Sequence, residues 1–576
     1  MKAYTSNNIR NIAVLGHGGK GKTTLCEAML YLAGATDRLG KVADGNTVLD
    51  FDAEEKRRKS SVSSAMAAIE WDNTKLNIID APGLFDFESG AAEAVRAAEA
   101  VLIVTSAGSG VDVGTEKAFK AAEKRGLAKF FAITKTDSDH RSFYKTFEAL
   151  KEVYGNKLCP TIIPYMEGNI TKSYVNLMTG MAYEYDAGGK ATKVPMPNDP
   201  VIEEMTSAFM EAVATTDDEL MEKFFEGETF TPDEILKGLC TGIFDGSIYP
   251  VYAVAGLTCA GVDQLLYNLA WSVPGAYGYA GETAKNEAGE DVVLPCDING
   301  PLAAVCFKTV ADPFVGKMSF FKVVSGKLSA DTQAYNVRTG ETEKMGKIVT
   351  VKGGKQEDAK EIIAGDIGVV TKLAGVNTND TFSTGEIFEF RKIIFPRPYM
   401  EKALKLAAKG DEDKISGGIA KLLEEDPTLK YVNNPETKQM TISGMGDMHL
   451  DITVSRLKNR YGTSVVLEEP RLAYRETIKG SSDVEGKHKK QSGGSGQYGH
   501  VKIRFAPGVE QGLTFRVSVV GGTVPKNFYP AVEKGIQEAV QKGPLAGYPM
   551  VGLKAVLYDG SYHPVDSNEM AFKLAA

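Results

Sequence analysis

The chain has 576 residues and a net charge of −9, with 43% hydrophobic and 24% charged residues. A single hydrophobic core stops growing at about 250–300 residues, so this length predicts several domains. The composition is typical of a globular protein, and no apolar run reaches the ~20 residues that a membrane helix needs. Because the polar N-terminus lacks the apolar core of a signal peptide, we expect a cytoplasmic location.

The cysteine spacing and the charge distribution bear on which kinds of site and partner the chain can have. The six cysteines are scattered, without a CxxC pair or a cluster with histidine, which argues against a zinc site or a redox motif. Residues 471–576 contain 14 lysines and arginines against 9 acidic residues, so the rest of the chain is acidic. A basic segment on an acidic body favours contact with a nucleic acid, but a solvated surface with a modest imbalance explains the charge equally well.

Residues 1–280 alternate short apolar strands with helical stretches, the pattern of a doubly wound α/β domain. A more irregular stretch at about 166–248 interrupts the alternation, and we interpret it as an insertion. The predicted strands of this domain lie at 12–15, 76–80, 101–105, 130–134 and 249–255.

Three smaller domains are predicted after a polar linker at 281–291. Residues 296–392 consist of short β-rich runs between turns, which is typical of a β-barrel or sandwich. Residues 397–471 alternate helix and strand, which indicates a split βαβ domain. Residues 472–576 mix strands with a helix at 531–542. The helical last residues, AFKLAA, have no stop signal after them, so we expect a chain shortened before its natural C-terminus.

The segment from Gly16 to Thr23 matches the phosphate-binding pattern GxxxxGK[ST] between a predicted strand and a predicted helix. Its glycines let backbone N–H groups surround phosphates, Lys22 reaches the β- and γ-phosphates, and the Thr23 hydroxyl binds Mg²⁺. A Gly-rich turn arising by chance is the alternative, which the strand-loop-helix context disfavours. The residues assigned to this loop are Gly16, His17, Gly18, Gly19, Lys20, Gly21, Lys22, Thr23 and Thr24.

Two further motifs end predicted strands, in the order expected of a guanine nucleotide site. At DAPG, the carboxylate of Asp80 holds Mg²⁺ and the next glycine N–H senses a γ-phosphate. At TKTD, Asp137 accepts the two hydrogen bonds that guanine donates and adenine does not. Each motif alone is weak, but together with the phosphate loop they predict binding of GTP or GDP with Mg²⁺. The residues assigned to these motifs and to the backbone amides of the base pocket are Asp80, Ala81, Pro82, Gly83, Thr134, Lys135, Thr136, Asp137, Ala255 and Gly256.

These motifs resemble the elongation factor G family of translational GTPases, and the resemblance covers essentially the whole chain. It also includes four longer segments, ADPFVGK (311–317), ISGMGDMHLDI (442–452), GGSGQYGHVKI (493–503) and LYDGSYHPVDSNEMAFK (557–573). The resemblance implies a multidomain α/β and β fold. Its parts are a P-loop GTPase domain with an insert, a β-barrel, a ferredoxin-like α+β domain and an α+β fourth domain. Family members carry a further C-terminal domain, and we expect it to be absent here.

Several positions depart from the family pattern. The histidine after DxPG, which positions the attacking water, corresponds to Leu84, whose side chain forms no hydrogen bond. In the family, two apolar residues control the position of that histidine, and the corresponding residues here are Gly18 and Ser60. The base-recognising asparagine corresponds to Thr134, which we expect to loosen its loop. The switch-I threonine that binds Mg²⁺ corresponds to Ser61, which keeps the hydroxyl.

The resemblance therefore implies that nucleotide binding is retained and that hydrolysis is weakened. The residues that it assigns to the metal are Thr23, Ser61 and Asp80, and those that it assigns to catalysis are Lys22 and the deficient position Leu84.

The tip of the fourth domain contacts RNA and the mRNA–tRNA duplex at the ribosomal decoding site in this family. Lysines neutralise phosphates there, and glycines permit close backbone approach. A solvated basic hairpin is the alternative reading of the same residues. The matching residues are Lys487, Lys489, Lys490, Gly493, Gly494, Ser495, Gly496, Gln497 and His563.

From the residues and the resemblance we expect a monomeric GTP-binding factor that acts on the ribosome, in translocation or a related elongation step, without a membrane partner. Ribosomal protection or ribosome recycling is one alternative. A GTP-dependent ribosome-binding protein with little hydrolysis is another, which Leu84 favours.

Overall fold

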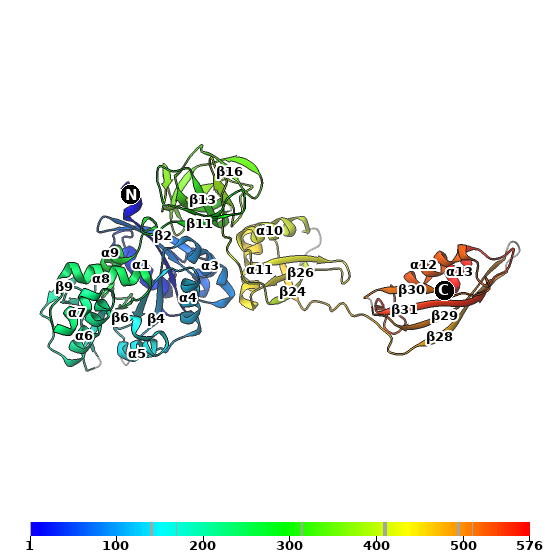
Figure 1. Cartoon of the computed structure of the whole chain (residues 1–576), viewed down its shortest axis with the longest axis horizontal. Coiled ribbons are helices and arrows are strands. Elements are labelled where there is room, and N and C mark those ends of the chain that lie inside the picture. Colours follow the sequence, from blue (N-terminus) through cyan, green and yellow to red (C-terminus); the bar gives the residue numbers. More distant parts are fainter. Residues whose placement is uncertain are drawn as a thin grey trace. The chain divides into compact units, whose positions relative to one another are not determined.

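The computed structural model describes residues 2–138, 142–168, 170–312, 315–406, 412–491, 496–509 and 511–576. The chain divides into two compact units. The first comprises Met1–Val432 with Thr441–Glu468, and the second comprises Asn433–Met440 with Glu469–Ala576. Figure 1 shows the elements of both units, coloured along the sequence.

The first domain is built on a mainly parallel sheet with the strand order β2-β3-β1-β4-β5-β10-β6. All five predicted strands are present. Every residue of β4 and β5 is buried, because helices cover both faces of the sheet. The strands are β1 (Ile9–Leu15), β2 (Ala65–Trp71), β3 (Thr74–Asp80), β4 (Ala100–Ser106), β5 (Ala128–Thr134), β6 (Leu158–Glu167) and β10 (Tyr249–Ala253). The helices include α1 (Lys22–Leu32), α2 (Ala53–Arg58), α3 (Glu88–Ala97), α4 (Val113–Lys124), α5 (Phe143–Tyr154) and α9 (Val262–Ser272).

The stretch at about 166–248, interpreted as an insertion, forms regular elements between β6 and β10. Three antiparallel strands extend the sheet from β6, and three helices follow them. Asp199, Asp217 and Thr231 cap the three helices, each accepting a hydrogen bond from a backbone N–H of the first turn. The elements are β7 (Ile170–Asn176), β8 (Met181–Tyr185), β9 (Ala191–Val194), α6 (Pro200–Ala214), α7 (Asp218–Glu226) and α8 (Pro232–Asp245).

An antiparallel β domain follows, with its own buried core around Phe321, Val370 and Phe382. The predicted linker at 281–291 is not a simple linker, because it enters a hairpin of β11 (Glu282–Lys285) and β12 (Asp291–Leu294) that pairs with β23 (Glu389–Phe390). The main strands are β13 (Ala303–Asp312), β14 (Gly316–Ser325), β16 (Gln333–Asn336), β17 (Glu341–Lys344), β18 (Ile348–Lys352), β19 (Lys355–Asp358), β21 (Ile367–Thr371) and β22 (Thr381–Ser383).

The next domain combines a four-stranded sheet, in the order β25-β26-β24-β27, with two helices. Ile415, Ile419 and Leu422 lie at helical spacing on α10 and are buried. The elements are β24 (Met400–Leu406), α10 (Glu412–Glu425), β25 (Lys430–Asn434), β26 (Gln439–Gly444), α11 (Asp447–Tyr461) and β27 (Val465–Glu468).

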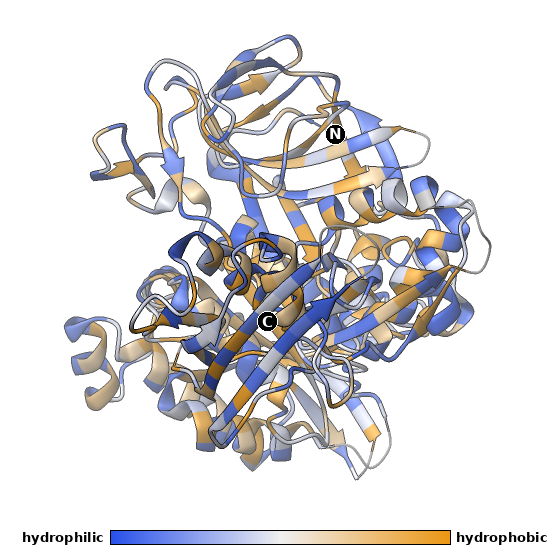
Figure 2. Ribbon diagram, turned by 90° about the vertical axis from the view of Figure 1, so that its right-hand side faces the viewer, coloured by the Kyte–Doolittle hydropathy of each residue, from blue (hydrophilic) through white to orange (hydrophobic). Residues whose placement is uncertain are grey.

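The second unit is an α+β domain whose sheet has the order β28-β29-β31-β30. Phe572 of the last helix stacks on Phe528 with ring centroids 4.5 Å apart, in a core that includes Val501 and Ile536. Figure 2 shows strands of this unit that mix hydrophilic and hydrophobic residues. The elements are β28 (Ser482–Lys490), β29 (Gln497–Pro507), β30 (Leu513–Val517), α12 (Tyr529–Ala539), β31 (Leu553–Ser561) and α13 (Glu569–Ala575).

Across the residues that the structure describes, none of the helices combines the length and the apolar character needed to cross a membrane.

Candidate functional site

The predicted phosphate loop lies between β1 and α1, and its backbone requires glycine. Gly16 has a φ of 139°, and a Cβ there would lie 2.2 Å from the carbonyl oxygen of Val104. The Lys22 ammonium folds back over the loop and donates to the carbonyl oxygens of Gly16 and His17, at 3.0 and 2.9 Å. A lysine held against a glycine loop at a helix N-terminus is the arrangement that recognises phosphate.

The three residues assigned to the metal come together at the ends of β1 and β3. The Thr23 Oγ1 lies 3.0 Å from the Ser61 Oγ, and the Thr23 side chain lowers the pKa of the Asp80 carboxyl against the larger effect of burial. The Ser61 hydroxyl also donates to Oδ1 of Asp50 at 2.7 Å. Two buried carboxylate oxygens, Oδ1 of Asp80 and Oδ2 of Asp50, have no hydrogen-bond partner among the described residues.

This donor set fits a Mg²⁺ ion, which takes oxygen ligands and commonly binds through one or two carboxylates, waters and substrate phosphates. In the described ranges, no group of three or more His, Cys, Asp or Glu side chains is arranged to hold a metal. Besides the Asp80 carboxylate, an ion at this place would therefore need the Thr23 and Ser61 hydroxyls and oxygens supplied by a nucleotide.

Negative charge is crowded around the same position. Burial, reinforced by the charge of Asp50, raises the pKa of Asp80 to about 7. The same two causes raise the pKa of Glu55 to about 7. A divalent cation would favour the charged carboxylates and reverse these shifts. Sequence reasoning missed Asp50, because it lies in a loop before α2 that carries no recognisable motif.

The loop after β5 is tied to the phosphate loop. The Thr134 hydroxyl donates to the carbonyl oxygen of Lys20 at 2.6 Å, and its Oγ1 also lies 3.0 Å from the carbonyl oxygen of Thr105. The Lys135 ammonium donates to the Gly19 carbonyl oxygen at 2.8 Å. Thr134 and Lys135 therefore both connect the end of β5 to the phosphate loop.

Asp137 meets the turn after β10, where the base pocket is predicted. Its Oδ2 accepts a hydrogen bond from the Thr258 hydroxyl at 2.9 Å. Ala255 forms an isolated bridge with Ala260, and a Cβ on Gly256 would lie 3.1 Å from the carbonyl oxygen of Thr24. Thr258 was not predicted, and the only signal for it is a hydroxyl two residues beyond Gly256.

Leu84 provides no polar group beside the phosphate loop. Its side chain packs, with Met448, against the buried residues Val62, Phe87 and Ile452. A Cβ on Gly18 would lie 3.0 Å from the Leu84 Cδ2, so the leucine lies directly over the loop.

Ser60 and His17 are polar residues of the segment before Ser61 and of the phosphate loop. Ser60 is half-buried, and its N–H donates to the carbonyl oxygen of Glu55 at 3.3 Å. The imidazole of His17 meets the Phe85 ring edge-on at 5.7 Å. His17 therefore packs as an aromatic neighbour, and its Nδ1 is buried without a hydrogen-bond partner among the described residues.

The predicted RNA-contacting residues gather at one end of the second unit. Lys487, Lys489 and Lys490 are exposed on β28. The Gly496 N–H donates to Asp566 at 3.1 Å, and the same carboxylate lies 3.3 Å from the imidazole of His563, so the hairpin end meets the loop after β31.

Of the other residues predicted to contact RNA, the structure describes Gln497 but not residues 493–495. Gln497 lies 2.9 Å from the His488 imidazole, through its Oε1. Gly493, Gly494 and Ser495 lie outside the described residues.

The strand-loop-helix at 9–32, DAPG after β3 and TKTD after β5 define the class of P-loop GTPase domains. Family models agree with this class and extend it along the chain. They are the elongation factor Tu GTP binding domain at residues 7–274, elongation factor G domain 2 at 301–385, elongation factor G domain III at 395–469 and elongation factor G domain IV at 470–576.

Whole-chain comparisons give the same result. The elongation factors G of Mycoplasma pneumoniae and Mycoplasma genitalium are 34% and 33% identical to this chain, covering 99% of it and 83% of each relative. A crystal structure from Thermus thermophilus matches with a TM-score of 0.85 and 34% identity, over 99% of this chain and 83% of that one. The chain belongs to the elongation factor G family.

Proposed function

We propose that this protein binds GTP and Mg²⁺ and acts on the ribosome in translocation or a related step of elongation. The observation that supports this proposal best is the convergence of Lys22, Thr23, Ser61 and Asp80 beside one glycine loop. Asp137, held by Thr258, would select guanine. The cytoplasm is the location that this function implies.

Each part of the site has a separate task in this proposal. The phosphate loop and Lys22 bind the β- and γ-phosphates and stabilise the negative charge that develops on them. Thr23, Ser61 and Asp80 would hold Mg²⁺, which neutralises phosphate charge when bound. The remaining task, orienting a water in line with the γ-phosphate, needs a polar group, and Leu84 lies in an apolar cluster instead.

A second function is suggested by the apolar surroundings of Leu84. If no other group orients the water, the protein binds the ribosome in a GTP-dependent way and hydrolyses little. Both functions share nucleotide binding, so Lys22→Ala should abolish binding of a fluorescent GDP analogue in either case.

Single-turnover GTP hydrolysis, with and without ribosomes, distinguishes the two functions. A positioned proton-handling group is worth roughly 10²–10⁴ in rate, so we expect slow hydrolysis by the wild type. Leu84→His should gain at least about tenfold, or about 1.4 kcal/mol of barrier. Leu84→Ala is the matched control, since it removes the side chain without adding a polar group, and it should gain nothing.

The outcomes are distinct. If the wild type hydrolyses GTP as fast as a histidine-bearing factor, Leu84 is no deficit. If wild type and Leu84→His both stay inactive on the ribosome while binding GTP, the GTP-dependent binding function is the correct one.

A further inference from the structure

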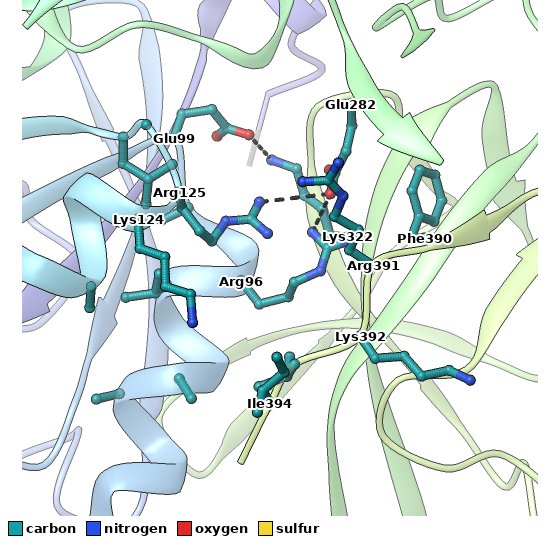
Figure 3. Close-up of a pocket in the computed structure, with 18 of the residues that line it drawn as sticks. Arg96, Glu99, Lys124, Arg125, Glu282, Lys322, Phe390, Arg391, Lys392 and Ile394 are labelled. Carbon is teal, nitrogen blue, oxygen red and sulfur yellow. Dashed lines mark hydrogen bonds and ion pairs between the residues drawn. The ribbon is translucent and has the colours of Figure 1, made fainter. Parts of the chain in front are cut away.

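A cleft with a volume of about 1280 Å³ lies within the first unit, between α3 and α4 on one side and β11, β23 and residues 391–396 on the other. Pockets for small molecules commonly measure about 300–1,000 Å³, so this cleft has room for one. One end reaches Gly83 and Leu84 of the nucleotide site. The opposite end, drawn in Figure 3, has a separate set of charged and apolar side chains, and none of the labelled residues is among those predicted for the nucleotide site.

Positive charge exceeds negative charge at this opposite end. The side chain of Arg96 is only 2% exposed, and its Nη1 lies 2.7 Å from Oε1 of Glu282. Arg125 approaches the same oxygen at 3.7 Å, so one carboxylate serves two guanidinium groups. Lys124 and Arg391 also line the cleft, and neither forms an ion pair within the described part of the chain.

The guanidinium of Arg96 is incompletely satisfied. Its Nε and Nη2 are buried and have no hydrogen-bond partner among the described residues. Burial lowers the pKa of Arg96, although Glu282 opposes this shift. A buried charge with one partner is costly, because the lost hydration is only partly replaced. A second anion beside Arg96 would offset that cost through charge-assisted hydrogen bonds.

An apolar wall adjoins the charged groups. Ile394 is 82% exposed and lines the same cleft as Arg96 and Lys124, with which it is labelled in Figure 3. Ile393 and Phe395 line the cleft on either side of it. Phe390 closes the back, with its ring centroid 5.8 Å from the Arg96 guanidinium carbon. Apolar walls with a few polar groups are characteristic of small-molecule sites.

We propose that this end of the cleft binds an organic anion, in which a carboxylate, sulfonate or phosphate group pairs with Arg96 and Arg125 and an apolar body lies along Ile394. The planar guanidinium fork matches such groups in bidentate geometry. Glu282 competes with the ligand for the two arginines. This site is additional to the nucleotide site and does not depend on the proposed function.

The test uses 1-anilinonaphthalene-8-sulfonate as the anionic probe and N-phenyl-1-naphthylamine, which lacks the sulfonate, as its neutral counterpart. Fluorescence titration of the whole chain should show saturable binding of the anionic probe. Arg125→Glu combined with Arg391→Glu should weaken it at least about tenfold and leave the neutral probe unchanged. Lys120→Glu, an exposed charge reversal on α4 outside the cleft, is the matched control and should change neither.

Glu282→Gln provides a test that misfolding cannot imitate, because removing the competing carboxylate should tighten binding of the anionic probe. Binding of a fluorescent GDP analogue checks that each variant is folded. The proposal is wrong if the double charge reversal weakens both probes equally or neither. It is also wrong if Glu282→Gln fails to tighten the anionic probe.

Discussion

At the scale of single residues, Asp137 is expected to decide which base the protein accepts. Asp137→Asn replaces a carboxylate oxygen by an amide donor, which pairs with the C2 carbonyl of xanthine but not with the donors of guanine. Hydrogen bonds to a charged group contribute about 1.5–3 kcal/mol, so affinity for GDP should fall roughly 10- to 100-fold while affinity for xanthosine diphosphate rises. Competition titrations against a fluorescent GDP analogue measure both.

Thr258→Val is the matched control for this prediction. It removes the hydroxyl that donates to Asp137 at 2.9 Å but keeps the carboxylate. We expect weaker binding with guanine still preferred. Equal affinity of the wild type for ATP and GTP would contradict the role of Asp137.

The carboxylates around Asp50 predict how the nucleotide-free chain responds to pH. Asp80 and Glu55 have pKa values of about 7 in the folded chain, whereas carboxyls in an unfolded chain titrate near about 4. The folded state therefore binds more protons between these values. The contribution of these two carboxyls to the free energy of unfolding is therefore highest below about pH 4 and falls as pH rises to about 7.

Asp50→Asn should flatten this dependence, because the charge of Asp50 raises both pKa values. We expect the thermal midpoint of the wild type to fall from about pH 5 to about pH 8 and that of the variant to fall less. Saturating Mg²⁺ with GDP should have a similar effect in the wild type. Asp218→Asn, at an exposed carboxylate of α7, is the control. A wild-type midpoint that rises over this range would refute the argument.

The sequence predicted those parts of the site that lie in short local motifs, since the phosphate loop, DAPG and TKTD each follow a strand directly. It missed Asp50 and Thr258, whose contacts with Ser61 and Asp137 join separate segments. A side chain that reaches the site only through tertiary contacts has no fixed sequence spacing from the motifs, so the sequence alone does not identify it. The anchoring role of the Thr134 hydroxyl is of the same kind, because it reaches across to Lys20.

At the scale of elements, the short helix α2 is held by α11 of a later domain. Asp52, which caps α2, accepts hydrogen bonds from Arg456 at 3.1 Å and from Arg460 at 2.7 Å. Burial would raise the pKa of Asp52, but Arg456, the backbone N–H of Glu54 and Arg460 together outweigh burial and lower it. The Ser455 hydroxyl donates to Glu54 at 2.6 Å. Since α2 lies just before Ser61, α11 stabilises the segment that brings the serine to the nucleotide site.

Arg460→Ala should loosen this segment. It leaves Asp52 and Glu425 without a shared partner, because Arg460 contacts both. Breaking a fully buried pair costs about 3–5 kcal/mol, and we expect about 1–2 kcal/mol here because Arg460 is 22% exposed. Urea unfolding measures the loss, and limited proteolysis should show faster cleavage within 52–60. Lys458→Ala, on the exposed side of the same helix, should change neither, and an identical loss there would argue against the ion pairs.

The elements that sequence reasoning missed have specific physical causes. Strand β6 contains Pro160 and Pro164, which argue against a central strand, yet it pairs with β10 on one side and β7 on the other. Strand β2 begins AMAA, and alanine favours helix over strand. Pairing with β3 overrides that preference, because it buries the first five residues of β2.

At the scale of the whole molecule, the basic segment of the sequence and the main part of the second compact unit begin at nearly the same residue. The basic segment starts at residue 471, and the second compact unit takes up the chain at Glu469. The imbalance therefore belongs to one folded body rather than to a tail. Within that body, three exposed lysines lie on the strand that leads to the hairpin end.

This distribution predicts how ribosome binding depends on salt. If the hairpin end contacts RNA phosphates, binding releases counterions, and the logarithm of affinity falls linearly with the logarithm of salt concentration by about 0.7–0.9 per contact. Replacing Lys487, Lys489 and Lys490 by alanine should therefore reduce the slope by about 2–3. Affinity for ribosomes, measured with a non-hydrolysable GTP analogue over a series of KCl concentrations, gives the slope.

The matched control replaces Lys526, Lys534 and Lys542, three exposed lysines of the same unit outside the hairpin. It removes the same charge, so it separates a local contact from a general electrostatic attraction. A slope that falls only in the hairpin variant assigns the phosphate contacts to the hairpin. Equal flattening in both variants would mean that the unit attracts RNA through its net charge alone, and an unchanged slope in the hairpin variant would place the RNA contacts elsewhere on the chain.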